Sequence, residues 1–122
     1  MTEKDYNIAT KLVRGAQVRS PHNETSEALY MTSGFVYESA EQAAAAFRDE
    51  DDCFVYSRYG NPTVKMFEQR LALLEGAEAC RATGTGMAAV FGALACQLSS
   101  GDRIVASRAL FGACHAILTK IL

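Results

Sequence analysis

The segment ATGTGMAAV, residues 82–90, sets glycines at the junction of two different hydrophobic patterns. The segment before it, residues 77–82, is short and mostly apolar, which is typical of a short buried strand. The apolar residues after it repeat at helical spacing: Met87, Val90, Phe91, Leu94 and Leu98. A second strand at 103–107 and a helix from Gly112 to Leu122 follow. The order strand, helix, strand, helix predicts a parallel α/β unit.

A well-marked helix precedes this unit. Asn61 can serve as its N-cap, Pro62 fits its first turn and Gly76 can end it. One face carries apolar residues that we expect in the core: Val64, Phe67, Leu71 and Leu74.

The part of the chain before this helix shows little periodicity. Ser39 and Gln42 form a capping-box pattern at the start of a short alanine-rich helix. Residues 1–36 are expected to form an extended arm with at most short helical turns, packed on something else such as a second subunit.

Composition limits the class of protein. With 122 residues, 49% of them hydrophobic, we expect one soluble globular domain, and a net charge of −2 gives no reason to expect nucleic acid or a membrane surface as partner. The four cysteines lack metal-ligand spacing and are expected to be small buried residues in a reducing cytosol. The chain stops inside an apolar helical pattern, HAILTKIL, so we expect the N-terminal piece of a longer protein.

The glycine turn is a candidate anion site, because the N–H groups at a helix start point outward with the positive end of the helix dipole. A plain structural turn is an equally good interpretation. The turn also matches the loose dinucleotide pattern G-x-G-x-x-A through Gly84, Gly86 and Ala89. The acidic residue which that pattern requires is not at the end of the next strand, where Ser107 and Arg108 stand. NAD binding is therefore disfavoured, whereas an NADP-type arginine stays open.

Two other segments are candidates for ligand binding. In FVYSRYGNPT, residues 54–63, Arg58 could hold a phosphate with help from the Tyr56 hydroxyl, or could be a surface arginine beside aromatic side chains that pack. Phe111 follows the second strand, where parallel sheets bind ligands, and could cover a planar ring or lie in the core.

Together, YSRYGNPT, LLEGAEACRATGTGMAAV and GDRIVASRALFGACH resemble the Cys/Met-metabolism family of pyridoxal-phosphate (PLP) enzymes. The family includes cystathionine γ-synthase, γ-lyases and homoserine-ester sulfhydrylases, and the resemblance is closest to the sulfhydrylases that use O-succinylhomoserine. The resemblance implies an N-terminal arm and short helix at 1–50. It implies the truncated first part of the large α/β/α domain, of the aspartate-aminotransferase type (fold type I), at 51–122. It further implies a cytoplasmic dimer of catalytic dimers in the full-length protein.

The resemblance also assigns roles to residues. Gly86 and Met87 match residues whose backbone amides hold the PLP phosphate, and Phe111 matches the aromatic residue that stacks on the pyridine ring. Tyr56 and Arg58 match a pair that reaches the phosphate of the neighbouring subunit's cofactor. Phenylalanine at 111 lacks the hydroxyl of the tyrosine found in many members, which favours a sulfhydrylase over a γ-lyase.

The family's Schiff-base lysine has no match among the lysines of this chain, which are Lys4, Lys11, Lys65 and Lys120. We therefore expect the chain alone to be inactive. In the full-length protein the resemblance implies γ-replacement, in which O-succinylhomoserine and sulfide give homocysteine and succinate. Other family members, a nicotinamide-dinucleotide-binding domain and a non-catalytic remnant remain as alternatives.

Overall fold

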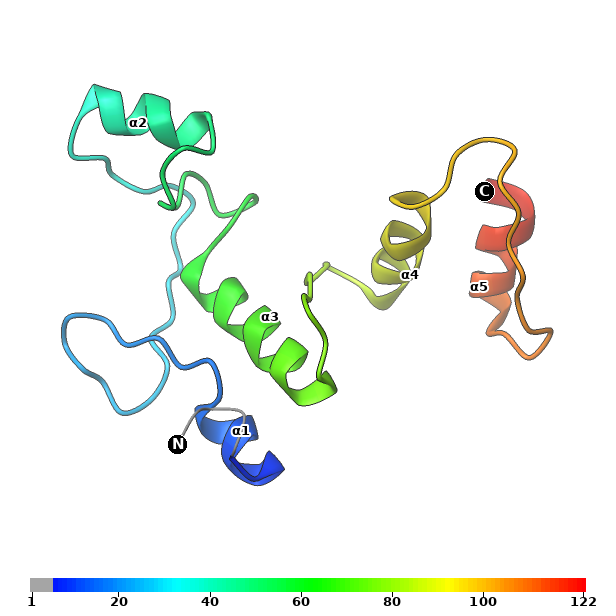
Figure 1. The fold of residues 1–122 in the computed structure, drawn as a ribbon, viewed down its shortest axis with the longest axis horizontal. Coiled ribbons are helices and arrows are strands. Elements are labelled where there is room, and N and C mark those ends of the chain that lie inside the picture. The colour runs from blue at the N-terminus through cyan, green and yellow to red at the C-terminus, as the bar shows by residue number, and fades with distance from the viewer. Residues whose placement is uncertain (1–5) are drawn as a thin grey trace. The chain divides into compact units, whose positions relative to one another are not determined.

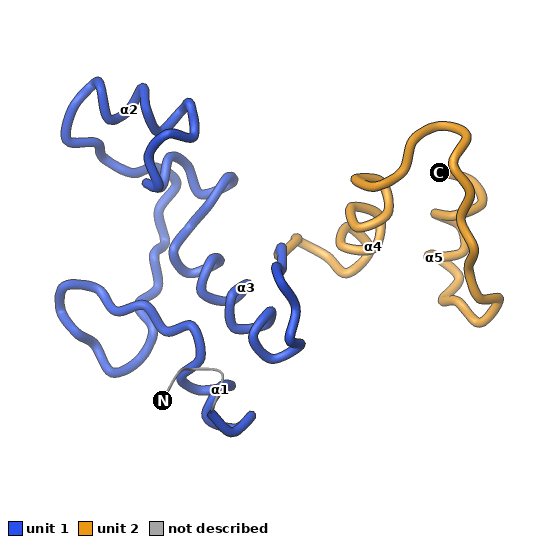
Figure 2. The backbone as a smooth tube through the Cα atoms, viewed as in Figure 1, with its two compact units in different colours: residues 1–81 blue, residues 82–122 orange. Residues whose placement is uncertain are grey.

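The computed structural model describes residues 6–122, which form two compact units divided between residues 81 and 82 (Figure 2). The first unit contains α1 (Ile8–Arg14), α2 (Ala40–Phe47) and α3 (Pro62–Glu75) (Figure 1). The second contains α4 (Gly86–Ala95) and α5 (Gly112–Ala116), which continues as the π-helical turn η2 (Ile117–Ile121). The helical prediction for 112–122 is thus confirmed.

In the first unit, α1 packs against α3 at a close backbone approach. A Cβ atom added to Gly15, which follows α1, would lie 2.6 Å from the Lys11 carbonyl oxygen and 2.7 Å from Leu73 Cδ2 of α3. The Gly15 carbonyl oxygen accepts a hydrogen bond of 2.8 Å from Arg70 Nε. Glycine at position 15 therefore lets the chain after α1 lie directly on α3.

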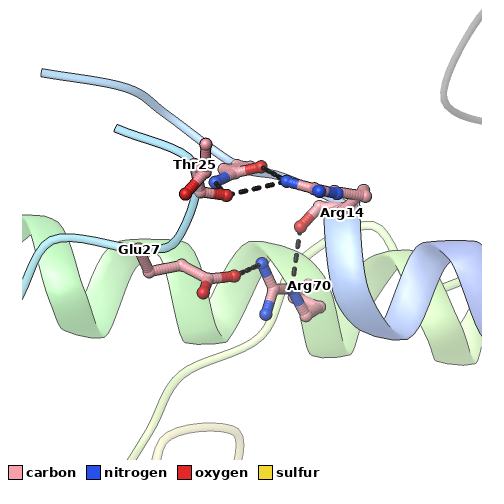
Figure 3. Close-up of polar contacts among 6 residues, drawn as sticks. Arg14, Thr25, Glu27 and Arg70 are labelled. Atoms are coloured by element: carbon pink, nitrogen blue, oxygen red, sulfur yellow. Dashed lines mark hydrogen bonds and ion pairs between the residues drawn. The ribbon is translucent and has the colours of Figure 1, made fainter. Parts of the chain in front are cut away.

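Polar contacts hold the segment after α1 to the same helix (Figure 3). Arg70 of α3 forms a half-buried ion pair with Glu27, in addition to its bond to Gly15. Arg14, in the last turn of α1, donates a 2.7 Å hydrogen bond to the Thr25 carbonyl oxygen. The predicted arm is therefore fixed to α3 within its own chain, and α1 supplies the short helical turns expected there.

The predicted ends of α3 and α2 are confirmed. Asn61 Oδ1 accepts from the Thr63 N–H at 2.9 Å, Pro62 is the first helical residue, and Gly76 ends α3 with a φ of +65°. Helices very commonly end with a residue in this left-handed conformation, and that residue is usually glycine. In α2, Ser39 Oγ accepts from the Gln42 N–H at 3.1 Å.

The prediction that the apolar face of α3 lies in the core is wrong for this structure. Met66 is the buried residue of the helix, whereas Val64, Phe67 and Leu71 are 41%, 57% and 36% exposed and Leu74 is half-buried. The reason is helical periodicity: Met66, Arg70 and Leu73 share the side that meets the α1 region, and the predicted apolar stripe lies on another side. No sheet forms in residues 6–122 to cover that stripe.

The predicted strands at 77–82 and 103–107 are also wrong for the described chain. A strand exists through hydrogen bonds to a neighbouring strand, and neither segment has such a neighbour in residues 6–122. The β pairing in this range is a single antiparallel bridge between Gly34 and Tyr56. The described residues are therefore mainly helical, without the sheet that the α/β prediction requires.

The cysteines differ from expectation in burial. Cys96 is exposed, and Cys53, Cys80 and Cys114 are half-buried free thiols. Cys96 lies at the C-cap of α4, just past the last helical residue.

Candidate cofactor site

Thr85 opens α4 and organises the backbone at the glycine turn. Its Oγ1 atom accepts from the Ala88 N–H at 3.1 Å, and its carbonyl oxygen accepts from the Ala89 N–H at 3.1 Å. Threonine with an extended backbone is a favourable N-cap, so the turn between residues 82 and 85 becomes a defined helix start. The N-cap role of Thr85 was not predicted, although a threonine directly before a helical pattern is a recognised signal for it.

The capping pattern leaves two donors for an outside ligand. The N–H groups of Gly86 and Met87 come first in α4, where no earlier turn offers a carbonyl acceptor. Neither meets an acceptor in the described part of the chain, since the Thr85 side chain is used by Ala88. A Cβ atom added to Gly84 or Gly86 would have no atom within 4 Å, so the space before the helix is open.

These donors suit a phosphate group. Two adjacent N–H groups at the positive end of a ten-residue helix form the arrangement that commonly binds phosphate oxygens. The residues present therefore fit the phosphate of PLP, in agreement with the interpretation of the glycine turn as an anion site.

Phe111 lies in the same unit, at the residue before α5. Its side chain is 73% exposed, so it is not a core residue of this structure. An exposed aromatic face can stack on a planar ring, which is the role implied for this residue.

Tyr56 and Arg58 lie together in the first unit. The Arg58 guanidinium carbon is 5.4 Å from the centre of the Tyr56 ring. The backbone turns tightly here, because the N–H groups of Tyr59 and Gly60 both donate to the Tyr56 carbonyl oxygen, at 2.9 and 3.1 Å. The pair is therefore presented on a compact turn.

Asn61 and Ser57 attach this turn to the segment around residues 30–34. Asn61 is 5% exposed, and its Nδ2 atom donates to the Tyr30 carbonyl oxygen at 2.9 Å and to Ser57 Oγ at 3.0 Å. Ser57 in turn donates through Oγ to the Thr32 carbonyl oxygen, and its N–H donates to the carbonyl of Ser33 at 2.9 Å. The cap at Asn61 follows from the local sequence, whereas these long-range contacts have no local signal in it.

The lysines lie outside the glycine turn and the Tyr56–Gly60 turn. Lys65 lies 3.7 Å from Asp52 and over the Phe54 ring, Lys11 is in α1 and Lys120 is in η2. Lys4 lies outside the described residues. The described residues contain no cluster of three or more His, Cys, Asp or Glu side chains able to hold a metal ion. No helix in residues 6–122 is long and apolar enough to cross a membrane.

The comparisons with known proteins decide the family. The family model for Cys/Met-metabolism PLP-dependent enzymes matches residues 9–122. The chain belongs to this family. Its cofactor is pyridoxal phosphate, so the nicotinamide interpretation of G-x-G-x-x-A is not the one that applies.

Relatives within the family are sulfhydrylases and lyases. The chain is 56% identical over 114 residues to the O-succinylhomoserine sulfhydrylase of Mycobacterium tuberculosis, covering 93% of this chain and 28% of the relative. It is 46% identical over 111 residues to the enzyme of the same name from Pseudomonas aeruginosa, covering 91% and 28%. It is 36% identical over 112 residues to the L-methionine gamma-lyase of Porphyromonas gingivalis, covering 92% and 28%. The chain thus spans less than a third of the length of these relatives.

A solved structure shares the fold of this part. It is a putative O-acetylhomoserine (thiol)-lyase from Campylobacter jejuni that contains N'-pyridoxyl-lysine-5'-monophosphate. The TM-score is 0.89 at 32% identity, covering 96% of this chain and 29% of that one. The helices of the described residues are therefore those of the corresponding part of a PLP enzyme.

Proposed function

We propose that this chain is the N-terminal part of an O-succinylhomoserine sulfhydrylase. The 56% identity to the sulfhydrylase of M. tuberculosis is the observation that supports this substrate most directly, against 36% for the γ-lyase of P. gingivalis. In the proposed reaction, sulfide replaces succinate at the γ-carbon of O-succinylhomoserine and gives homocysteine. PLP, when bound, supplies the electron sink for this chemistry.

The proposed roles of the residues follow their positions in each unit. Gly86 and Met87 hold the cofactor phosphate through their backbone N–H groups, and Phe111 stacks on the pyridine ring. Tyr56 and Arg58 reach the phosphate of the cofactor in the neighbouring subunit. The tight turn that fixes them and the charge of Arg58 support this role.

The chain alone is proposed to be inactive, because no lysine in it matches the Schiff-base position of the family. We place the arm and short helix at 1–50 and the first part of the large fold-type-I domain at 51–122. The full-length protein is proposed to be a cytoplasmic dimer of catalytic dimers. The sheet absent from residues 6–122 would then be completed by other parts of that domain.

Product analysis tests the substrate. The full-length protein loaded with PLP is incubated with sulfide and either O-succinylhomoserine or O-acetylhomoserine, and homocysteine is measured. We expect a higher kcat/KM for the succinyl ester. Release of α-ketobutyrate in place of homocysteine would assign the protein to the γ-lyases, and preference for the acetyl ester would overturn the proposed substrate.

Mixed dimers test the role of Arg58 across the subunit interface. Arg58→Ala and a variant without the Schiff-base lysine are each expected to have low activity. Their mixture is expected to regain part of it, because one of the two sites in a mixed dimer is intact. Mixed dimers that form but show no recovery would rule out action across the interface.

A further inference from the structure

Tyr59 is the second aromatic neighbour of Arg58 and has no part in the proposed function above. The Arg58 guanidinium carbon lies 5.3 Å from the centre of the Tyr59 ring, as close as it lies to the Tyr56 ring. Both distances fall within the range of cation–π attraction. In the described residues no carboxylate forms an ion pair with Arg58, so its charge stays available for an outside anion.

The backbone turn accounts for this arrangement. Tyr56 and Tyr59 are three residues apart, and the bond from the Tyr59 N–H to the Tyr56 carbonyl oxygen closes the turn between them. Arg58 lies inside that turn, and Ser57 and Asn61 fix both of its ends to the segment 30–34. The ring of Tyr59 is therefore brought to Arg58 by a loop that is hydrogen-bonded at both ends.

Burial gives no reason for an aromatic residue at this position. The Tyr59 side chain is 77% exposed, and no hydrogen bond of its hydroxyl is present in the described residues. The Tyr59 ring interacts with the Arg58 guanidinium.

We infer that Tyr59 is a positioning residue for Arg58. An arginine can stack its planar face on an aromatic ring while the N–H groups at its edge bind a phosphate. A free arginine side chain loses rotamer entropy when it is fixed. Contact with the Tyr59 ring restricts those rotamers before the phosphate arrives, so less freedom is lost on binding. The inference rests on the proposed role of Arg58 as a phosphate ligand.

The test measures cofactor affinity in the full-length apoprotein, by titration with PLP and with pyridoxal, which lacks the phosphate. Tyr59→Leu keeps an apolar side chain without a π face and is expected to raise the Kd for PLP about two- to fivefold, the size of an exposed cation–π contact. Tyr59→Phe keeps the ring and is expected to match the wild type. Neither variant is expected to change the Kd for pyridoxal.

A double variant separates positioning from general damage. In the Arg58→Ala background, Tyr59→Leu is expected to have no further effect on the Kd for PLP, because the residue it positions is gone. Additive effects, or an equal loss of PLP and pyridoxal affinity in Tyr59→Leu, would overturn the inference. An unchanged Kd for PLP in Arg58→Ala would instead overturn the proposed role of Arg58 itself.

Discussion

The side chain of Asn61 caps α3 and at the same time donates a hydrogen bond to the carbonyl oxygen of Tyr30, 31 residues earlier. One buried amide thus joins three parts of the first unit: the helix start, the Tyr56–Gly60 turn through Ser57, and the segment at Tyr30. Because every polar atom of this amide has a partner, its burial carries no unsatisfied group. The turn that presents Arg58 therefore depends on a residue outside it.

Asn61→Ala is expected to lower the free energy of unfolding by about 2–4 kcal/mol, because it removes a helix cap and two further hydrogen bonds, to the Tyr30 carbonyl and Ser57 Oγ. Urea unfolding followed by circular dichroism measures the loss. Asn7→Ala is the matched control, since exposed Asn7 caps α1 through the Ala9 N–H at 3.0 Å and its side chain makes no long-range hydrogen bond within residues 6–122. The control should cost only about 1 kcal/mol. Equal losses in the two variants would contradict the joining role of Asn61.

Gly86→Pro is expected to weaken PLP binding while α4 remains intact. Proline is accommodated at the first position of a helix, and the extended backbone of Thr85 suits the residue before a proline. The substitution removes one N–H donor to the phosphate, worth about 1.5–3 kcal/mol for a bond to a charged group. Gly92→Ala lies in α4 away from the helix start, keeps both N–H donors and should bind PLP as the wild type does. Spectroscopic titration of the apoprotein measures both, and equal affinities would exclude a role for the Gly86 N–H.

Gly15→Ala is expected to destabilise the first unit by about 1–3 kcal/mol through overpacking. The backbone at Gly15 has a φ of −63°, which alanine adopts readily, so the cost comes from the close contacts with Lys11 and Leu73. Gly92→Ala in α4 is the control, with no atom within 4 Å of the added Cβ. It should stabilise the helix by about 0.5–1 kcal/mol. Thermal unfolding midpoints are therefore expected to move in opposite directions, and a shift in the same direction would contradict the close approach.

Glu24 is expected to titrate far below an ordinary glutamate. Hydrogen bonds from the Ser20 hydroxyl and the Ser20 N–H, at 2.6 and 2.8 Å, lower the pKa of its carboxyl from 4.5 to about 2. A pKa lowered by folding means that the carboxylate stabilises the fold above about pH 4.5, and that this contribution is lost as the pH falls toward 2. Carbon-13 NMR of the carboxyl group measures the titration. In Ser20→Ala the pKa should return toward 4.5, and an unchanged low value would exclude the Ser20 hydroxyl as the main cause.

Helix ends were the part of the fold that local sequence predicted well. Asn61, Pro62 and Gly76 for α3, and Ser39 with Gln42 for α2, act through backbone groups a few residues away, so short-range chemistry is enough. The strands at 77–82 and 103–107 failed because a strand depends on a neighbour that the described residues do not supply. Gly86 and Met87 were predicted as candidate anion-binding residues on similar local grounds, because a helix start exposes its own N–H groups.

The sequence by itself determined the family, through three ordered motifs, and the places where helices begin and end. Only the tertiary structure decided which side of α3 is covered, because burial depends on the partner that a helix meets and not on its apolar stripe alone. It also decided that Asn61 reaches Tyr30 and that Arg58 lies near two aromatic rings. These contacts join residues whose spacing in the chain carries no pattern, so they exist only once the backbone has brought them within a few ångströms.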